Sequence, residues 1–424
     1  MLNKFANTFF TKGVSAVISF AIIIITAKIL GAEVRGNISL LILGISVITM
    51  ISQVAGGPAL VYLIPKSNVS SLTGISYLWA IMSCVVFSFT LTVTNFVPAT
   101  HFIPLLAISL LQCLAHIHLT ILVGKEKIHY HNLIMLVQVF SQIIFFAFFL
   151  FITGEKNINS FVMALFISNG ITYLFGVAAS YKYLKGFKIA DIPPLFKTMF
   201  KKGIFVLLAN LTHLLSIRII YYFLNLFTGT KAVGVFSTGV SITESILLIS
   251  SSVSFVIYSR IANSNDQIYA QNLTIRLSKA CFILTMPVLL MLSLLPISFY
   301  ILLFGPDFSA VKDVIIGLSF GIASMSFSMI YSHYFAGIGK YHINAFASFL
   351  AFIITLISGY FIIPVWGITG AAWIASLSYI ASSLFLFTLF LKHSNTNLFQ
   401  LMPSFNDISL LNKHLLYYLK KINS

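Results

Sequence analysis

The sequence predicts an all-α polytopic integral membrane protein with twelve transmembrane helices in two six-helix lobes. Three observations predict it: the composition, a series of long apolar segments, and an internal repeat. Of the 424 residues, 59% are hydrophobic and only 8% are charged, and the mean hydropathy is +1.00. So little charge cannot cover the surface of a water-soluble protein. The composition therefore excludes an ordinary soluble domain.

The basic residues indicate a lipid partner rather than nucleic acid. The chain has 25 Lys and Arg against 9 Asp and Glu, which gives a formal net charge of +16. In a soluble protein this charge would raise the question of nucleic-acid binding. Here the basic residues lie between long apolar segments, so we expect anionic membrane lipids as partners and no nucleic acid.

Twelve apolar segments are long enough to cross a bilayer as helices. A hydrocarbon core of about 30 Å needs roughly 20 apolar residues of helix, because it offers no water to an exposed backbone. The predicted spans are 13–30, 39–60, 75–93, 102–123, 133–151, 161–179, 203–226, 233–258, 280–304, 314–336, 345–363 and 368–391. The first lacks an A-x-A cleavage site and is long, so we interpret it as an uncleaved span.

The distribution of Lys and Arg predicts the orientation, because positive charge is retained on the cytoplasmic side. Nineteen basic residues lie on one set of alternate connections, and Arg218 lies within a span. The other set carries only five basic residues, which are Lys28, Arg35, Lys156, Lys231 and Lys312. Both termini are therefore predicted to be cytoplasmic.

The predicted organisation has a six-helix lobe over 1–190, a cytoplasmic linker over 191–202, a second six-helix lobe over 203–391 and a cytoplasmic amphipathic tail over 392–424. The connection 181–202 carries six lysines, and its two prolines precede apolar residues at 195, 196, 199 and 200. This pattern fits a short helix on the bilayer surface with its lysines toward lipid head groups. The tail repeats the pattern, and simple anchoring explains both segments.

An internal repeat relates the two lobes. A shift of 198 residues gives the matches Gly31/Gly229, Gly36/Gly234, Ser39/Ser237, Ile48/Ile246, Ile51/Ile249 and Ser52/Ser250. A shift of 213 residues aligns Gly124, Lys127 and His129 with Gly337, Lys340 and His342. An even number of spans in each repeat preserves topology. We therefore expect parallel six-helix repeats related by an axis along the membrane normal.

Arg218 and Glu244 are charged residues deep within predicted spans. An ionisable residue at this depth is costly and usually faces a cavity or a partner. Arg218 lies eleven residues before Gly229 and Glu244 ten after Gly234, so each is about 15 Å below the outer end of antiparallel helices. The pair is either structural or a substrate or coupling site. We favour the second interpretation, because apolar packing could replace a structural pair.

Lys28, Glu33 and Arg35 form a second candidate group at the outer end of the first span. Lys28 and Arg35 are seven residues apart and share a face only if the helix continues through Gly31. Two cations aimed into a cavity would bind a diphosphate, Arg through paired hydrogen bonds and Lys as a point charge. Snorkelling to the outer interface is the alternative interpretation.

The sequence gives no indication of a cofactor, a metal or enzyme chemistry. It lacks a G-x-x-x-x-G-K-[ST] loop, which disfavours an ATP-driven pump, and its short connections carry no nucleophile, acid and base constellation. The histidines within predicted spans could be ligands or proton carriers; they are His116, His118, His213 and His333. Because their spacing matches no metal motif, packing or a hydrogen bond within the bundle is favoured for each.

Three short stretches resemble Wzx-type polysaccharide-lipid flippases, which are relatives of the MATE-like multidrug and lipid flippase (MOP) superfamily. They are residues 27–36 (AKILGAEVRG), 302–308 (LLFGPDF) and 364–372 (PVWGITGAA). The resemblance spans essentially the whole chain and implies a V-shaped pair of lobes around a cationic cavity. Cavities in this family carry several cations, a role that Arg218, and less directly Lys28 and Arg35, would fill.

The resemblance implies a flippase that moves an undecaprenyl-diphosphate-linked oligosaccharide, an O-antigen or capsule repeat unit, across the bacterial inner membrane by alternating access. A polysaccharide polymerase and a chain-length regulator are the protein partners that it implies. The alternative is a MATE-like cation-coupled multidrug exporter, in which Glu244 would be the proton- or sodium-binding carboxylate. A non-transporting membrane scaffold is a third class, which the charged residues within spans disfavour.

Overall fold

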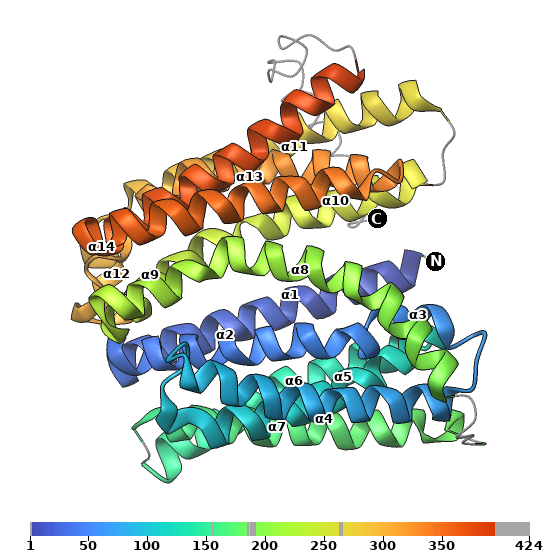
Figure 1. The fold of residues 1–424 in the computed structure, drawn as a ribbon. Coiled ribbons are helices and arrows are strands. Elements are labelled where there is room, and N and C mark those ends of the chain that lie inside the picture. Colours follow the sequence, from blue (N-terminus) through green and yellow to red (C-terminus); the bar gives the residue numbers. More distant parts are fainter. Residues whose placement is uncertain (1, 155, 185, 187–191, 263–265, 395–424) are drawn as a thin grey trace, which may run out of the picture. The chain divides into compact units, whose positions relative to one another are not determined.

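The computed structural model describes residues 2–154, 156–184, 186, 192–262 and 266–394, and every regular element in them is a helix (Figure 1). The first elements are α1 (Leu2–Ile25), the π-helix η1 (Thr26–Leu30), α2 (Gly31–Gly56), α3 (Pro58–Leu63), α4 (Val69–Val93), η2 (Ala99–His101), α5 (Phe102–Gly124), α6 (Ile128–Ala147), η3 (Phe148–Ile152), α7 (Ile158–Ser180) and η4 (Tyr181–Tyr183). They are followed by α8 (Ile192–Thr228), α9 (Thr230–Ser245), α10 (Leu247–Ala262), α11 (Gln267–Leu294), α12 (Ile297–Phe304), η6 (Pro306–Phe308), α13 (Val311–Gly337) and α14 (Tyr341–Ser394). The prediction of an all-α protein is confirmed.

Within the described residues, eight helical segments are long and apolar enough to cross a membrane, or nine if the bent pair Asn210–Ser216 and Arg218–Thr228 is one span. Two of the eight, Gly13–Val61 and His342–Ser394, have 49 and 53 residues. At about 1.5 Å per residue, each is more than twice as long as the hydrocarbon core is thick. The chain is therefore a multi-pass helical membrane protein. The number of segments is smaller than the twelve predicted spans partly because the two longest segments are each long enough to cross the membrane twice.

Glycines in the left-handed region interrupt the two longest segments. Gly31, between η1 and α2, has φ 81° and ψ 174°, and Gly367 within α14 has φ 53° and ψ −131°. Side chains other than hydrogen make such conformations costly. α14 is therefore two helices joined at Gly367. The same argument places Lys28 and Arg35 on opposite sides of a break, so they do not share a continuous helix face.

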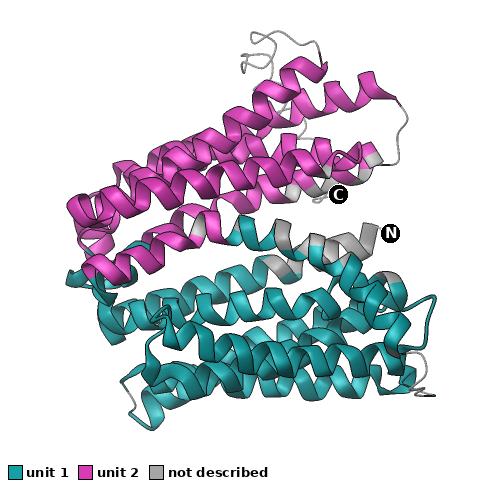
Figure 2. Ribbon diagram, in the orientation of Figure 1, with its two compact units in different colours: residues 1–214, 229–237, 303–308 teal, residues 215–228, 238–302, 309–424 magenta. Residues whose placement is uncertain are grey.

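The chain forms two compact units, coloured separately in Figure 2. Unit 1 comprises residues 1–214, 229–237 and 303–308, and unit 2 comprises residues 215–228, 238–302 and 309–424. The division falls within α8, α9 and α12. The lobe boundaries at 190 and 203 stay predictions, and the predicted tail lies outside the described residues from residue 395 onward.

Unit 1 has an apolar core in which α2, α4 and α5 meet. Leu41, Leu72 and Ile108 are completely buried in it. Met199 of α8 is buried in the same core, and Leu195, one helix turn earlier, packs against it. Residues 192–202 are therefore the beginning of α8 and not the separate surface helix expected from their lysines. The apolar side chains at 195 and 199 share one face, and burying that face holds the segment against unit 1.

Unit 2 has a core built around α13. Tyr334 of α13 packs edge-on against Phe390 of α14, with 5.0 Å between ring centroids. Elsewhere the Ser376 hydroxyl of α14 donates to the Gly317 carbonyl at 2.6 Å and accepts from the Gly321 N–H at 2.7 Å. Small residues allow this close approach, which matters in a membrane because helix association there has no hydrophobic driving force.

Residues matched by the 198-residue repeat contact each other within unit 1. A Cβ atom on Gly36 of α2 would lie 1.8 Å from the Thr230 carbonyl oxygen, and one on Gly234 of α9 would lie 1.9 Å from the Ala32 carbonyl oxygen. Thr230 is itself 198 positions after Ala32. The contact is thus reciprocal, which is the signature of a local two-fold axis.

One turn further along, the same two helices are joined by a hydrogen bond between equivalent side chains. The Ser39 hydroxyl of α2 donates to the Ser237 hydroxyl of α9 at 2.8 Å. Ser39 is 5% exposed and Ser237 2% exposed. A residue can contact its own repeat equivalent only near the axis that relates the repeats. The serine and glycine contacts together support the predicted repeat.

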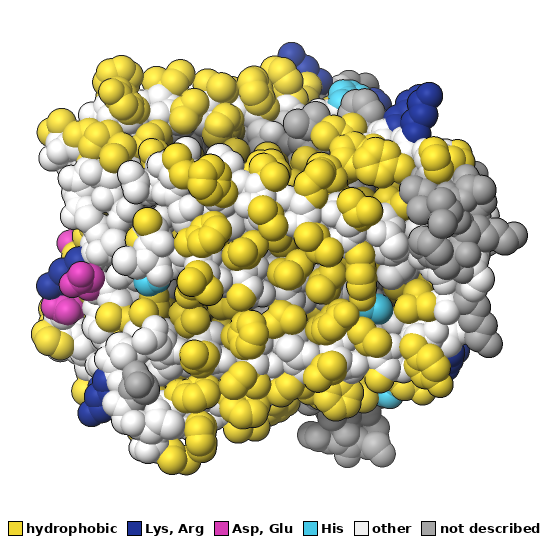
Figure 3. Space-filling model, turned by 60° about the horizontal axis from the view of Figure 1, so that its bottom comes forward, with side chains coloured by type: hydrophobic (Ala, Val, Ile, Leu, Met, Phe, Trp, Pro, Cys, Tyr) yellow, Lys and Arg dark blue, Asp and Glu magenta, His cyan; other side chains and the backbone are white. Residues whose placement is uncertain are grey.

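Hydrophobic side chains spread over the face drawn in Figure 3, and the charged side chains visible there lie at its margins. Helix α4 by itself exposes Leu78, Val85 and Phe89. Apolar exposure on this scale is unfavourable in water and is satisfied by lipid tails. The surface thus agrees with a membrane-spanning protein.

We predict that cysteines at positions 39 and 237 form a disulfide. In a background whose three native cysteines are replaced by Ala, mild oxidation of Ser39→Cys/Ser237→Cys should join the two positions, since the native hydroxyl oxygens lie 2.8 Å apart. A protease site inserted at Lys66 would lie between them. The two fragments should migrate together without reductant and separately with it.

The matched control pairs Ser39→Cys with Val235→Cys, whose side chain leaves the opposite side of α9, about 200° around the helix. This pair should stay largely unlinked under the same oxidation. Equal linkage of both pairs, or no linkage of the first, would show that α2 and α9 do not meet at Ser39 and Ser237.

Candidate functional site

Arg218 and Glu244 lie on the consecutive helices α8 and α9, and the chain reverses direction in the turn between them. α8 ends at Thr228, Gly229 has φ 91°, and α9 begins at Thr230. Each of the two charged residues also lies beside an irregularity in its helix. α8 bends by 42° just before Arg218, and α9 ends at Ser245, directly after Glu244. Interrupted helices at membrane depth are a common setting for binding sites in transporters.

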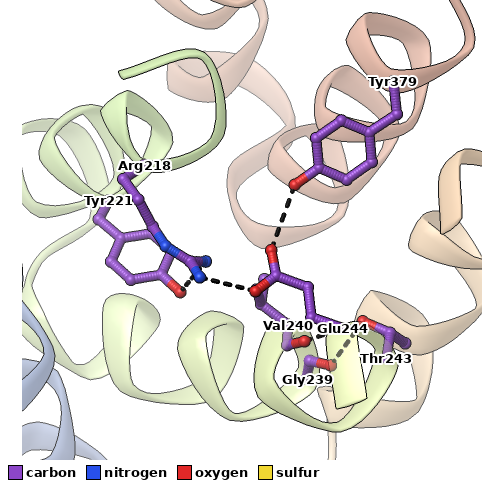
Figure 4. Close-up of polar contacts among 7 residues, drawn as sticks. All are labelled: Arg218, Tyr221, Gly239, Val240, Thr243, Glu244 and Tyr379. Atoms are coloured by element: carbon purple, nitrogen blue, oxygen red, sulfur yellow. Dashed lines mark hydrogen bonds and ion pairs between the residues drawn. The ribbon is translucent and has the colours of Figure 1, made fainter. Parts of the chain in front are cut away.

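The two charged side chains meet in a polar cluster within unit 2 (Figure 4). Arg218 Nη2 lies 2.6 Å from Glu244 Oε2. Arg218 Nη1 donates to the Tyr221 hydroxyl at 3.0 Å, and the guanidinium carbon lies 5.3 Å from the centroid of that ring. Tyr379 of α14 donates its hydroxyl to Glu244 Oε1 at 3.4 Å. The sequence-based expectation that Arg218 and Glu244 are neighbours is therefore confirmed.

The cluster is reachable from outside the protein. The Arg218 and Glu244 side chains are 26% and 22% exposed. A guanidinium carries five N–H donors, and the contacts with Glu244 and Tyr221 occupy one on each terminal nitrogen. Among the described contacts, Arg218 therefore retains N–H donors with which an anionic ligand could make its first contact.

Two members of the cluster were not predicted from the sequence. Tyr221 lies one helix turn after Arg218, and residues three apart on a helix share a face, so the spacing could have identified it. Tyr379 follows Glu244 by 135 positions. No local pattern connects Tyr379 with the pair, because α14 reaches the site only through the packing of unit 2.

The second candidate group, Lys28, Glu33 and Arg35, extends across the break at Gly31. Lys28 and Glu33 are exposed, whereas Arg35 is only 5% exposed. Lys28 belongs to the π-helix η1, and Arg35 belongs to α2 beyond the Gly31 break. The two cations therefore lie on different helical elements, and their joint action on a diphosphate stays a prediction.

An ion pair near Gly31 was also missed by the sequence analysis. Lys231 Nζ of α9 lies 2.8 Å from Asp307 Oδ1 of η6. The Asp307 carboxylate also accepts a hydrogen bond from the backbone N–H of Ala32, and its other oxygen would be 3.7 Å from a Cβ on Gly31. Asp307 therefore connects the beginning of α2 with the beginning of α9. Both side chains are about half exposed, so the pair adds little stability by itself.

The histidines behave mostly as the packing interpretation expects. His118 is buried and contacts the Tyr77 hydroxyl through Nε2 and the Ser180 hydroxyl through Nδ1, the latter at 2.7 Å. His333 Nδ1 contacts the Met329 carbonyl at 2.8 Å. The His213 side chain lies outside the described part of the structure. Among the side chains that the structure describes, no group of three or more His, Cys, Asp or Glu could hold a metal ion.

The chain belongs to the polysaccharide biosynthesis protein family. The match to the family covers residues 1–258, which is more than half of the 424-residue chain. The resemblance to Wzx-type flippases is thereby confirmed at the level of the family. The protein is thus a membrane transporter and not an enzyme. A comparison with curated proteins found no match.

Solved structures of the MOP superfamily share the fold of this chain. Lipid II flippase MurJ in an inward closed conformation matches with a TM-score of 0.73 at 16% identity, over 92% of this chain and 90% of that chain. An inward-facing multidrug resistance MATE family transporter matches with 0.70 at 16% identity, over 90% and 94%. A variant of the Vibrio cholerae MATE transporter VcmN matches with 0.61 at 14% identity, over 95% and 98%. The predicted MATE-like fold is therefore confirmed, and identities this low show the fold alone.

We predict that Arg218 and Glu244 depend on each other for folding. Arg218→Glu or Glu244→Arg alone places two like charges in one cluster, and an unpaired buried charge costs about 3–5 kcal/mol when fully buried. The cost here is smaller, because both side chains are about a quarter exposed. The exchange Arg218→Glu/Glu244→Arg should restore protein abundance in membranes and the thermal unfolding temperature in detergent.

The comparison needs the single and double variants at equal expression. An exchange variant no more abundant than either single variant would argue that the pair contributes nothing to folding. Exchanging the half-exposed pair in the same way, Lys231→Asp/Asp307→Lys, serves as a control that should change abundance little in any combination.

Proposed function

We propose that this transporter is a flippase for an undecaprenyl-diphosphate-linked oligosaccharide, the repeat unit of an O-antigen or a capsule, in the bacterial inner membrane. Membership of the polysaccharide biosynthesis family supports a sugar-containing substrate. The shared fold with lipid II flippase MurJ supports a lipid-linked one. The observation that carries the proposal is Arg218, a partly exposed cation beside interrupted helices within a membrane-spanning unit.

The proposal includes twelve spans with both termini in the cytoplasm. The two longest helical segments, broken at Gly31 and Gly367, each count as two spans. The bent pair around Arg218 adds one, and α9 with α10 adds another, because each of these helices has only 16 residues. With the six remaining segments these make twelve. The excess of Lys and Arg on one set of connections sets the orientation.

In the proposed mechanism Arg218 holds the diphosphate midway through alternating access. The diphosphate is the most costly part of the substrate to bring into a membrane, and a guanidinium matches paired phosphate oxygens. Glu244 competes for the same guanidinium and so limits how tightly the substrate binds. Outward movement of negative charge toward an outside-positive potential is favoured by about 2.3 kcal/mol per charge per 100 mV, so no ATP site is required in principle.

In the proposed mechanism, contacts among α2, α9 and η6 close the outer end of the transporter before the substrate is released. The Ser39–Ser237 hydrogen bond joins α9 to α2, and the Lys231–Asp307 ion pair joins α9 to η6, where Asp307 also accepts from the Ala32 N–H of α2. The charge count places these contacts at the outer end. Both must separate when the substrate leaves. Lys28, Glu33 and Arg35 lie near this end, and we propose a secondary role for the two cations in release. A polymerase and a chain-length regulator would act on the product.

A MATE-like cation-coupled multidrug exporter is the second candidate. The observation that favours it is Glu244, a carboxylate within a membrane-spanning unit, on a fold shared with MATE transporters. The two candidates differ in which charge is essential. A flippase needs the Arg218 cation, whereas a cation-coupled exporter needs the Glu244 carboxylate.

We predict that transport follows the charge at position 218. Surface polysaccharide in cells lacking their native flippase should fall in the order Arg, Lys, Gln, because Lys keeps the charge but loses the planar fork. Replacing Arg218 alone leaves Glu244 unpaired, so the informative variant is Arg218→Gln/Glu244→Gln, a neutral pair of similar size. At matched protein levels it should lose most of the output, by roughly tenfold or more, as expected for a lost charged hydrogen bond.

Glu244→Gln alone is the matched control, since it preserves the Arg218 cation and should retain substantial polysaccharide output. Full output from a well-folded Arg218→Gln/Glu244→Gln variant would reject Arg218 as the diphosphate partner. Loss of output in Glu244→Gln, accompanied by drug resistance conferred by the wild type, would favour the exporter.

We predict the orientation from the distribution of charge. Single cysteines placed beside Lys231 and beside Lys340 should react with a membrane-impermeant maleimide from the outside and from the inside, respectively, when intact cells are compared with inverted vesicles. The reverse labelling would overturn the orientation and, with it, the assignment of the Lys231–Asp307 pair to the outer side.

A further inference from the structure

Unit 1 contains a groove that the site around Arg218 does not involve. It has a volume of about 520 Å³ and lies where α2 ends, α3 begins, α5 ends and α6 begins. It is lined by Gln53, Gly57, Val61, His116, Leu119, Thr120, Val123 and His131. The groove exists because α2 stops at Gly56 and the chain turns at Gly57, where a Cβ would lie 2.7 Å from the Gln53 carbonyl oxygen.

The lining combines apolar walls with a small polar part. Val61, Leu119 and Val123 supply the walls. The polar part contains two imidazoles, since His116 of α5 and His131 of α6 both line the groove. Thr120 donates its hydroxyl to the His116 carbonyl at 2.8 Å, so that hydroxyl donor is already used. His131 Nδ1 lies 3.2 Å from Asn132 Oδ1, and the contacts of the described residues do not use its Nε2.

The charge around the groove favours an anion. None of the described residues that line it is acidic, and the turn between α5 and α6 carries two bases, Lys125 and Lys127, against one acid, Glu126. Imidazole and amide N–H groups donate to phosphate oxygens, and an imidazole that gains a proton also gains the complementary charge. Among the described residues no third His, Cys, Asp or Glu joins these two imidazoles as a possible metal ligand, so they are a poor metal site.

The position of the groove along the helices fits a lipid whose head group is anionic. Val123 lies one residue and His116 eight residues before the end of α5 at Gly124, so the lining extends from roughly 1.5 to 12 Å into the helix from that end. The charge count places this end in the cytoplasm. That depth spans the boundary between lipid head groups and the first carbons of the tails.

We propose that this groove is an entry site for the isoprenoid-diphosphate end of the lipid-linked substrate in the cytoplasmic leaflet. The proposal rests on the proposed function and names a second recognition site, separate from Arg218. His116, His131 and Gln53 contact the diphosphate, and the walls of Val61, Leu119 and Val123 contact the first isoprene units. The volume equals that of about 17 water molecules at about 30 Å³ each, enough for a diphosphate and the first unit or two.

The test measures binding of farnesyl diphosphate to the full-length protein in nanodiscs by native mass spectrometry. The deep site is first neutralised with Arg218→Gln/Glu244→Gln, so that remaining binding comes from elsewhere. In that background His116→Gln/His131→Gln should weaken binding at least tenfold. Val123→Trp, which fills the groove without touching a histidine, should do the same. His129→Gln is the matched control, because His129 is exposed two residues from His131 and should leave binding unchanged.

Competitors identify which part of the probe is recognised. Undecaprenyl phosphate should displace farnesyl diphosphate, whereas farnesol, inorganic diphosphate and phosphatidylglycerol should displace it at least tenfold less well. Equal displacement by phosphatidylglycerol would show a general site for anionic lipids and overturn the proposal. If inorganic diphosphate displaced the probe as effectively as undecaprenyl phosphate, the groove would not recognise the isoprenoid chain, and the proposed isoprenoid contact would be rejected.

The failure of this proposal is distinguishable from failure of the proposed function. Farnesyl diphosphate binding that disappears with Arg218→Gln/Glu244→Gln and ignores the groove variants would overturn the entry site and leave the flippase in place. Normal surface polysaccharide from groove variants with wild-type unfolding temperatures would overturn it as well. Wild-type protein that restores no polysaccharide in cells lacking their flippase would instead reject the proposed function.

Discussion

The requirement that every backbone polar group be satisfied without water constrains the whole structure. In a helical membrane protein, a continuous helix meets this requirement with its own hydrogen bonds. Each interruption of a helix therefore needs residues that tolerate the local conformation and other partners for the freed backbone groups. Gly31, Gly229 and Gly367 supply the positive φ angles at three of these places. The charged residues collect beside interruptions. Arg218 follows the bend in α8, Glu244 precedes the end of α9, and Lys28 lies in a π-helix. Interrupted backbone and intramembrane charge are thus two aspects of one feature, a local departure from a dry, regular helix.

The hydrocarbon surroundings also explain the contact between α2 and α9. Apolar side chains gain nothing by leaving lipid for another apolar surface, so close backbone packing and interhelical hydrogen bonds hold membrane helices together. At Gly36 and Gly234 a single methyl group would lie within 2 Å of a carbonyl oxygen on the opposite helix. The reciprocal glycine contact and the Ser39–Ser237 bond therefore make a small, specific interface from residues that the repeat duplicates. Because the two repeats are equivalent at this interface, each contact that α2 makes with α9 is matched by the same contact from α9 to α2.

Sequence reasoning predicted what composition and helical spacing determine, and failed where distant segments meet. Long apolar runs predicted the helices, and the distances of Arg218 and Glu244 from a shared turn predicted their pairing. Tyr379 and Asp307 were missed, because tertiary packing alone brings them to Glu244 and to Lys231. The lysines of the connection 181–202 suggested a surface helix, but lysines have long stems and tolerate either setting. The burial of the Met199 face decided the matter. The number of spans depends on where each helix is continuous. Hydropathy does not show whether a helix continues through a glycine.

The proposed diphosphate site has to solve a problem of charge. Arg218 and Glu244 form a neutral pair, and a diphosphate brought beside it would place excess negative charge in a low-dielectric setting. The substrate is therefore held only if the carboxylate leaves the guanidinium. Tyr379 already donates to the other oxygen of Glu244, so it can keep that carboxylate hydrogen-bonded as Arg218 turns to the ligand. The same exchange prevents tight trapping, because Glu244 recaptures Arg218 when the diphosphate departs. A single paired cation is in this respect better suited to release than a cavity of several free ones, since the internal carboxylate competes at every cycle.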